Sequence, residues 1–389
     1  MKIGVIGTGV AGALFAAAAR REAPGIEIEA FEKIQLGERD DAGTGLNIGP
    51  NALKAMRLHG GIALKELLDA SLPWTRWVID LTDGTRLIDL DMIELAGEPG
   101  IRIRWADLYA VMRAASADLT TYDRALAEIE VDTGGRLIPV FRTAAGEAVR
   151  AGPFDLLISA DGRYSRIREL VAGKPEAHFP GIGTWRLLVR DVGDDCPIDE
   201  YGQYFCGNAR LLSFRLPQGD VYIAGSFPLP GEGPMPEEMK TAAVQRAFFE
   251  PQGRAPSREV AWMLDQIDQH VGEMNWARTQ EIEPLYHAMD GRILFLGDAC
   301  HAMFQTLGQG ATQAIEDALT AARCLSAGSP KAVCQTYEAM RSERVAFAAG
   351  FTREATDTML PGADPVAGSL AKAQEPFLSK LRKLYVDVS

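Results

Sequence analysis

The sequence predicts an α/β fold in which a Rossmann-like domain is interleaved with a smaller, β-sheet-rich domain and followed by a C-terminal helical region. Three observations predict it. A short apolar run leads into a glycine-rich turn and an alanine-rich helical stretch over residues 2–21. Strand patterns dominate from residue 178 to about 274. After Gly310 the pattern is helical, with breaks near "AGS" and "MLPGADP".

Length and composition exclude several classes of protein. A chain of 389 residues is long enough for two lobes with separate cores. A net charge of -13 argues against a nucleic-acid partner, which needs dense lysine and arginine surfaces. The five cysteines show neither CxxC pairs nor metal-ligand spacing, which predicts buried free thiols, no metal and a cytoplasmic location. No apolar run is long enough to span a membrane, so we expect no membrane partner.

The first element is a strand over residues 2–7, because "KIGVIG" is short, β-branched and uninterrupted. It leads into Gly7, Gly9 and Gly12, which form the G-x-G-x-x-G pattern. In that pattern the glycines allow a tight turn and a close approach of the backbone to a pyrophosphate, which then lies at the positive end of a helix. Val10 and Ala11 begin this helix and belong to the same predicted cradle.

The next strand, "IEIEAFEK", ends at Glu32, the position expected for a carboxylate that binds a ribose hydroxyl. Lys33 follows it, and we assign it to the same cradle. A carboxylate here predicts an unphosphorylated ribose, and therefore FAD or NAD. If the glycines served only a tight turn, the strand, the helix and Glu32 would be left without an explanation.

The following elements are expected in chain order. Pro50 begins a helix that ends at Gly60 and Gly61, and "WTRWVIDLTDGTRLIDLDM" predicts a hairpin with a D-G turn. A helix starts within "IRIRWADLYAVMRAAS", and "PFDLLISADGRYSRIREL" predicts a buried strand, an acidic turn and a helix. The strands of the second lobe are "TWRLLVRDV", "YGQYFC", "ARLLSFRL" and "DVYIAGSF". "GRILFLGDA" predicts one more buried strand with a turn.

Three segments carry a family resemblance: "GVIGTGVAG" with Glu32, "DLLISADGRYSRIR", and "LGDACHAMFQTLGQGATQAIEDA". In this order they resemble the class A, single-component flavin-dependent aromatic monooxygenases, which include p-hydroxybenzoate hydroxylase, salicylate hydroxylase and 6-hydroxynicotinate 3-monooxygenase. The resemblance extends from Met1 to about residue 345 and is vague across the middle lobe. It implies an FAD-binding domain from segments 1–75, 101–177 and 281–330, a substrate domain from 76–100 and 178–280, and C-terminal helices over 331–389.

The resemblance also implies an activity. Its members bind FAD, take up NADH or NADPH transiently and use O2 as co-substrate. The expected reaction is hydroxylation of a small aromatic or N-heteroaromatic substrate, of the phenol, hydroxybenzoate or hydroxypyridine-acid type, through a flavin C4a-hydroperoxide. We expect a monomer or a homodimer.

Several FAD contacts are implied by the resemblance alone. Asp298 of "GDA" would bind the ribityl or ribose region, and Asp161 of "ADG" would link the pyrophosphate region to the nicotinamide cofactor. A helix beginning near Gly310 would present its positive end to the flavin ring. Its first turn and the residue before it contribute Gly308, Gln309, Gly310 and Ala311.

The chain departs from the family pattern at two positions. Family members carry arginine where this sequence has Trp105, and Arg104, one position earlier, reaches the FAD only if the turn shifts. Gln305 stands where relatives have proline beside the flavin, and its amide is a candidate partner for the substrate or for flavin N5, with a tolerated loop replacement as the alternative.

The substrate side of the site is predicted from residue type and position. The candidate active-site residues are Asn47, Tyr204, Arg210, Arg215 and Gln305. Asn47 lies in the flavin-side loop, an arginine can clamp a substrate carboxylate, and a tyrosine can hydrogen-bond a ring hydroxyl. For each of the strand residues the alternative is a side chain that only faces solvent.

Two other functions stay open at this point. The same flavin fold serves tailoring oxygenases that epoxidise or open rings on larger scaffolds. A flavin-binding protein without turnover is the non-enzymatic alternative, suggested only by Trp105 and Gln305. An ordinary NAD dehydrogenase would give no reason for the distal "GDA" and "LGQG" elements.

Overall fold

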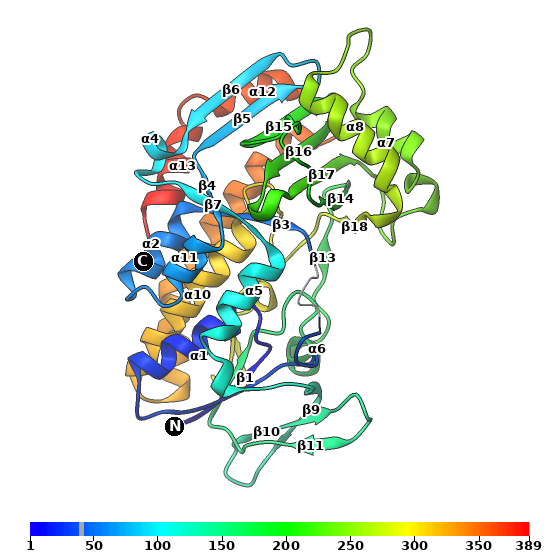
Figure 1. Cartoon of the computed structure of the whole chain (residues 1–389). Helices are drawn as coiled ribbons and strands as arrows, with labels where there is room; N and C mark the ends of the chain where they lie inside the picture. The colour runs from blue at the N-terminus through cyan, green and yellow to red at the C-terminus, as the bar shows by residue number, and fades with distance from the viewer. Residues whose placement is uncertain (39–42, 389) are drawn as a thin grey trace.

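The first strand, β1 (Lys2–Ile6), lies inside a six-stranded sheet in the computed structural model, which describes residues 1–38 and 43–388 (Figure 1). The strand order is β20–β21–β12–β1–β2–β8, parallel except for the antiparallel edge strand β20. The apolar residues of β1 are buried, as expected for a parallel sheet covered on both faces. The other strands are β2 (Glu27–Phe31), β8 (Thr120–Thr121), β12 (Leu156–Ser159), β20 (His287–Ala288) and β21 (Ile293–Phe295).

Helices α1 (Val10–Glu22) and α10 (Gln309–Cys324) pack closely against each other and share one core with this sheet. The alanines of α1 permit the close approach, since they add little bulk between the helix axes. Other helices of this half are α2 (Pro50–Leu58), α3 (Leu64–Asp69), α5 (Trp105–Ala114), α6 (Arg166–Ala172), α9 (Asp298–His301) and the single turn η1 (Ala117–Leu119).

Three small sheets extend this half. One joins β3 (Gly45–Ile48), β7 (Gly100–Arg104) and β4 (Leu72–Trp74). A second, at the bottom of Figure 1, joins β9 (Ala125–Val131), β10 (Leu137–Arg142) and β11 (Ala148–Arg150). The third pairs β13 (Ala177–His178) with β19 (Glu281–Ile282).

A seven-stranded sheet of order β18–β14–β17–β16–β15–β5–β6 forms the second half, antiparallel except between β15 and β5. The predicted D-G hairpin is present as β5 and β6. The strands are β5 (Arg76–Leu81), β6 (Arg86–Asp91), β14 (Ile182–Val189), β15 (Tyr201–Cys206), β16 (Ala209–Arg215), β17 (Val221–Pro228) and β18 (Asn275–Arg278).

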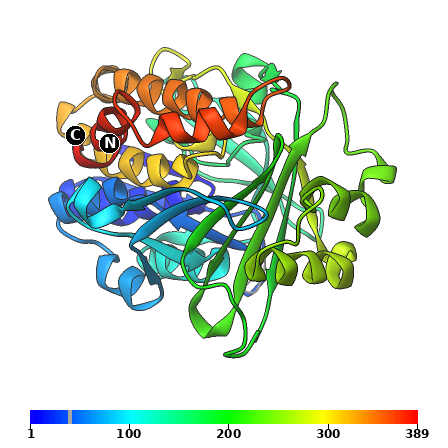
Figure 2. The same ribbon diagram turned by 90° about the horizontal axis from the view of Figure 1, so that it is seen from above.

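Two helices absent from the strand-rich prediction cover the outer face of this sheet: α7 (Ala242–Phe249) and α8 (Arg258–His270) (Figure 2). The sequence does carry signals for both, because Thr241 and Ser257 are N-caps whose hydroxyls accept bonds from Val244 N and Val260 N. Short single turns flank these elements: η2 (Pro217–Gly219), η3 (Glu237–Met239) and η4 (Val271–Glu273).

The inner face of the same sheet packs on the C-terminal helices and on the first half of the molecule. Aromatic residues Trp74, Tyr201 and Phe214 share one core with Phe377 and Tyr385 of α13. The C-terminal end is helical as predicted, with breaks at the first "AGS" (residues 327–329) and at "MLPGADP"; the second "AGS" (residues 367–369) lies within a helix. Its elements are η5 (Leu325–Ala327), α11 (Pro330–Ala355), η6 (Asp357–Met359), α12 (Pro365–Lys372) and α13 (Phe377–Val386); α4 (Met92–Ala96) packs on α13.

The fold class is the α/β arrangement that the sequence predicts, whereas the boundaries proposed for the individual domains stay a prediction. All five cysteines are free; Cys300, Cys324 and Cys334 are buried, but Cys196 and Cys206 are partly exposed and correct the expectation that all are buried. Within residues 1–38 and 43–388, no helix is both long and apolar enough to cross a membrane, and no cluster of His, Cys, Asp and Glu side chains suited to a metal is found.

Candidate active site

A cleft of about 640 Å³ opens where the turn after β1 meets the ends of β2 and β12 and one face of α5. Five of the predicted cofactor-binding residues line it: Gly7, Gly9, Glu32, Lys33 and Asp161. The carboxyl ends of parallel strands meet at this edge of the sheet, which is where open α/β folds bind nucleotides.

The glycine turn is shaped so that no side chain fits. Gly7 has φ +88°, and a Cβ atom there would lie 2.5 Å from the carbonyl oxygen of Ala160. A Cβ on Gly12 would lie 1.9 Å from the carbonyl oxygen of Gly7. Val10 and Ala11 form the first turn of α1, behind the N-cap residue Gly9. Their backbone amides therefore form the positive end of a helix beside bare backbone, which suits a pyrophosphate.

The Glu32 carboxylate is fixed at the mouth of the cleft. Its Oε2 accepts hydrogen bonds from the Thr8 amide (2.8 Å) and hydroxyl (3.2 Å), and its Oε1 accepts one from the Lys33 amide (2.9 Å). Oε1 also accepts a longer bond from the Ile34 amide (3.4 Å). The protein therefore uses about as many acceptor positions as a carboxylate offers, and a ribose hydroxyl would replace or share one of the longer bonds.

Asp161 lines the cleft but directs its carboxylate into its own turn. Its Oδ1 accepts from the Ser159 hydroxyl (2.7 Å), and its Oδ2 accepts from the Ile167 amide (3.2 Å) at the start of α6. The side chain therefore shapes the turn after β12, and the backbone of that turn faces the cleft.

A second group of predicted residues converges on the N-terminus of α10. A Cβ on Gly308, which has φ +64°, would lie 2.7 Å from Asn47 Nδ2, and one on Gly310 would lie 3.7 Å from Asp298 Oδ1. Asn47, from β3, and Asp298, from α9, thus flank the first turn of α10, where Ala311 is partly exposed. No residue of that turn is itself acidic, so Asp298 is the carboxylate beside its amides, whose positive end can still face a ligand.

The Gln309 side chain points the other way, into a buried polar network, so only its backbone faces the predicted flavin side. Its Oε1 accepts from Asn51 (3.2 Å) and Gln313 (3.0 Å). Asn51 also donates to Glu316, which pairs with Arg341 (2.8 Å). Burial by itself raises the pKa of the Glu316 carboxyl, but Arg341 and Arg344 outweigh it and hold that pKa below its usual value.

On the inner face of the seven-stranded sheet lies Arg210, which is 4% exposed. Its guanidinium makes only long contacts, 3.5 Å to Gln203 Oε1 and 3.5 Å to Ser226 Oγ, and its Nε has no partner among the described residues. Burial lowers the pKa of the Arg210 guanidinium, but an arginine stays charged. The inner face of this sheet therefore holds a buried cation that no carboxylate balances at hydrogen-bond distance in the described part of the chain.

Gln305 connects this inner face to the loop before α10. Its Oε1 accepts a 2.7 Å bond from Arg186 of β14, and its Nε2 lies 3.4 Å from Thr279 Oγ1. Arg186 was not predicted as a site residue. The family-typical proline could not accept this bond, so the glutamine gives the inner face a contact that the family pattern lacks.

Two of the residues predicted to bind the substrate, Tyr204 and Arg215, lie on the outer face of the seven-stranded sheet, away from Arg210. β15 and β16 are joined through Gly207 and Asn208, with Phe205 opposite Arg210 and Tyr204 opposite Leu211. Tyr204 therefore points outward into the core beneath α7 and α8, where burial raises the pKa of its phenol. Arg215 has the same outward parity and donates to the carbonyl of Gly193 (2.9 Å). The prediction that these two line the substrate pocket is wrong, because adjacent residues of a strand face opposite sides.

Arg104 also lies apart from the cleft. Its Nη1 donates to Gln218 Oε1 (2.9 Å), and its Nε is 3.4 Å from Asp220. The position argues against the predicted FAD contact. The cleft is lined instead by Trp105, Tyr109 and Arg113 of α5. The prediction named Trp105 only as a departure from the family arginine, and it missed Tyr109 and Arg113 although the spacing of four residues puts all three on one helix face.

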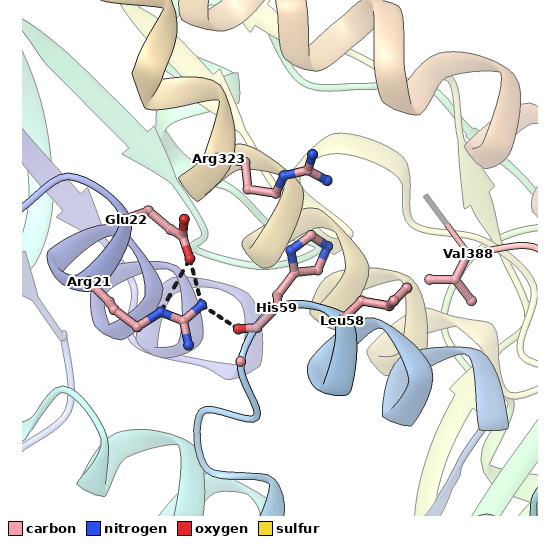
Figure 3. Close-up of a pocket in the computed structure, with 7 residues that line it drawn as sticks. Arg21, Glu22, Leu58, His59, Arg323 and Val388 are labelled. Atoms are coloured by element: carbon pink, nitrogen blue, oxygen red, sulfur yellow. Dashed lines mark hydrogen bonds and ion pairs between the residues drawn. The ribbon is translucent and has the colours of Figure 1, made fainter.

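A second cleft of about 470 Å³ shares no lining residue with the first (Figure 3). It lies at the far end of α1, where Arg21 donates to Glu22 and to the His59 carbonyl. Arg323 and Val388 complete its wall. None of the predicted site residues lies in it.

Known proteins match this chain along most of its length. A family model described as an FAD binding domain matches residues 261–355. An FAD-dependent urate hydroxylase of Klebsiella pneumoniae is 28% identical over 352 residues, covering 89% of this chain and 87% of that protein. A 6-hydroxynicotinate 3-monooxygenase of Pseudomonas fluorescens is 26% identical over 359 residues, covering 88% of each. Over most of its length the chain is thus similar to class A flavin monooxygenases.

Solved structures extend the class A flavin monooxygenase match to the fold. Klebsiella pneumoniae HpxO, complexed with FAD and uric acid, aligns with a TM-score of 0.78 at 23% identity, over 98% of this chain and 93% of that one. The cofactor of these relatives is FAD, and the residues present fit it. Gly7 in the cleft and Gly12 behind it leave bare backbone for the pyrophosphate, and Glu32 lines the cleft for the ribose. The open helix end at Gly308, which is not part of the cleft lining, suits the flavin ring.

Proposed function

We propose that this class A flavin monooxygenase uses FAD, NAD(P)H and O2 to hydroxylate a small aromatic or N-heteroaromatic ring that carries a negative charge. When bound, FAD supplies the transfer of one oxygen atom to an electron-rich ring carbon, with NAD(P)H as the reductant. Relatives named for urate and for 6-hydroxynicotinate support a small heteroaromatic substrate.

The single observation that carries the proposal is Arg210. A buried guanidinium without a carboxylate partner costs several kcal/mol of solvation, and proteins retain such costs chiefly at functional sites. Arg210 shares its face of β16 with Leu212 and Phe214, and both of these pack in the same core as Leu307, which lies just before α10. A carboxylate or ring oxyanion on the substrate would provide the missing partner through charge-assisted bonds.

The other residues of the inner face have roles that follow from their contacts. Arg186 donates a 2.7 Å hydrogen bond to Gln305, which orients it. Arg186 lies on β14 opposite Ala224, which puts its side chain on the same face of the sheet as Arg210 and supplies a second cation there. Asn47 presents its amide beside Gly308, where it can hydrogen-bond the substrate or the flavin edge. Aromatic residues Tyr201 and Tyr222 pack around this region and exclude water, which strengthens the charge pairing.

The proposal includes a location and an assembly state. We propose that the enzyme works in the cytoplasm, as a monomer or a homodimer. The five free thiols support a reducing compartment. Size-exclusion chromatography with light scattering distinguishes the two assembly states.

Purification and a substrate panel test the activity. The protein should be yellow and retain FAD, and NADH or NADPH oxidation should accelerate with hydroxylated benzoates, pyridine acids or oxo-purines. Matched methyl esters or amides, which lack the charge, should stimulate less. Product mass spectra with ¹⁸O₂ should show one labelled oxygen on the ring; ring opening or epoxidation would indicate a tailoring oxygenase. Colourless protein that FAD cannot reconstitute would refute the proposal.

A further inference from the structure

Helix α5 presents a stripe of three side chains to the cofactor cleft. Trp105, Tyr109 and Arg113 are four residues apart and all line the cleft. The Trp105 and Tyr109 rings are 4.6 Å apart, and the Arg113 guanidinium lies 4.7 Å from the centre of the Tyr109 ring. The aromatic rings therefore support the cation and fix its direction.

This stripe ends at the glycine turn. Arg113 Nε donates to the Thr8 carbonyl (3.4 Å), between Gly7 and Gly9. Tyr109 Oη lies 3.2 Å from the position of a Cβ on Gly9, so the helix contacts the turn directly. Among the described residues Arg113 makes no ion pair, and its hydrogen bond to Thr8 uses only Nε. Its two terminal amino groups are thus available at the place where the backbone is shaped for a pyrophosphate.

The family position for the FAD-binding arginine holds Trp105 in this chain, and its neighbour Arg104 turns to Gln218 and Asp220. Lys33 also lines the cleft, beside Glu32, whereas two other cleft-lining cations bind elsewhere in the protein. Arg124 donates to the carbonyls of Tyr122 and Asp123, and Arg166 donates to the carbonyl of Ala127 and pairs with Glu169. Arg113 is the cleft-lining cation that contacts the glycine turn itself.

We propose that Arg113, positioned by Tyr109, pairs with the pyrophosphate of FAD. It would supply the positive charge that the family pattern has at the position of Trp105. The inference rests on the proposed function in that FAD occupies this cleft. A guanidinium can bind two phosphate oxygens at once, and two turns of α5 separate Arg113 from the family position. The class A cofactor would thus be held by a cation placed further along the same helix.

Flavin binding to the apoprotein tests the proposal without any turnover. FAD and riboflavin are titrated by flavin fluorescence into wild type, Arg113→Ala, Arg113→Gln, Arg113→Lys and the matched control Arg104→Met. Riboflavin lacks the pyrophosphate. Loss of a charge-assisted contact should raise the Kd for FAD about tenfold to a hundredfold in the Ala and Gln variants. The Lys variant should lose less, riboflavin binding should not change, and Arg104→Met should bind FAD as wild type does.

Each outcome decides a different point. Unchanged FAD affinity in the Arg113 variants overturns the inference, as does an equal loss for riboflavin, because a pyrophosphate contact cannot affect a ligand without phosphate. Weakening by Arg104→Met alone would return the role to Arg104. Thermal melts of the apoproteins identify variants that do not fold. If the Ala and Gln variants do not fold, Arg113→Lys, which retains charge and packing, is the test: its loss of affinity for FAD is compared with its loss for riboflavin. Wild type that binds no FAD refutes the proposed function itself.

Discussion

Replacing Arg210 by methionine should stabilise the ligand-free enzyme while weakening its substrate binding. Arg210 is 4% exposed and has only 3.5 Å contacts to Gln203 and Ser226, so little hydrogen-bond energy is lost with it. Methionine has a similar length and needs no partner in an apolar core.

The magnitude follows from two opposing terms. Removing buried charge in favour of an apolar side chain of similar volume is worth about 1–4 kcal/mol. The smaller volume of methionine costs about 1 kcal/mol. The ligand-free variant should therefore unfold at equal or higher urea concentration than wild type. For an anionic substrate, losing a charge-assisted bond should cost about 1.5–3 kcal/mol, which raises its Kd about tenfold to a hundredfold.

Urea unfolding followed by circular dichroism, and substrate titration of the FAD-loaded enzyme, measure the two effects. Arg102→Met is the matched control. Arg102 is also buried, but it donates to the carbonyls of Pro73 (3.0 Å) and Asp199. Its removal leaves buried acceptors unpaired, so this variant should lose about 1–3 kcal/mol of stability for each acceptor.

The reasoning about Arg210 fails if Arg210→Met is destabilised as much as Arg102→Met and still binds substrate like wild type. That pair of results would mean that the guanidinium is a structural group satisfied within the protein. A loss of binding for the anionic substrate with none for its methyl ester would support the charge pairing specifically.

Three further predictions concern the cofactor turn, the buried network and the inner face. Gly12→Ala should retain little FAD and melt lower, since its Cβ would lie 1.9 Å from a carbonyl oxygen; the ratio of flavin to protein absorbance measures this. Glu316→Gln should lose about 3–5 kcal/mol at pH 7, because it leaves Arg341 buried with one partner fewer. The Glu316 carboxyl has a depressed pKa, so its stabilisation is present above about pH 4.5 and is lost as the pH falls through the folded-state pKa. Urea unfolding from pH 3 to 7 should therefore show that the unfolding free energy of the variant depends less steeply on pH than that of wild type. An equal dependence on pH would contradict the assignment. Gln305→Pro should release Arg186 and raise the KM about tenfold without changing FAD content; steady-state kinetics with equal KM values would argue against this role.

Local features such as turns and hairpins were predictable from the sequence because they depend on residues that are neighbours along the chain. The β1–α1 turn, the carboxylate at Glu32 and the D-G hairpin are short-range features, and each is present. The helices α7 and α8 were missed although their caps, Thr241 and Ser257, are visible in the sequence. The strand-rich context outweighed those signals.

The face of each strand residue was also within reach. A two-residue connection, Gly207 and Asn208, fixes the register of β15 on β16, and this register puts Tyr204 and Arg210 on opposite faces. The same parity rule separates Arg210 from Arg215, which are five positions apart on one strand.

By itself the sequence determined the class of fold, the glycine turn and the resemblance to class A flavin monooxygenases, since glycine spacing and apolar period act over a few residues. Only the tertiary structure decided which charged groups are balanced. Arg104 pairs with Asp220, which is distant in sequence, and Arg113 contacts the glycine turn. Arg210 is buried without a carboxylate in hydrogen-bond range among the described residues. Electrostatic pairing depends on distances between residues far apart in the chain, and those distances exist only once the sheets and helices have packed.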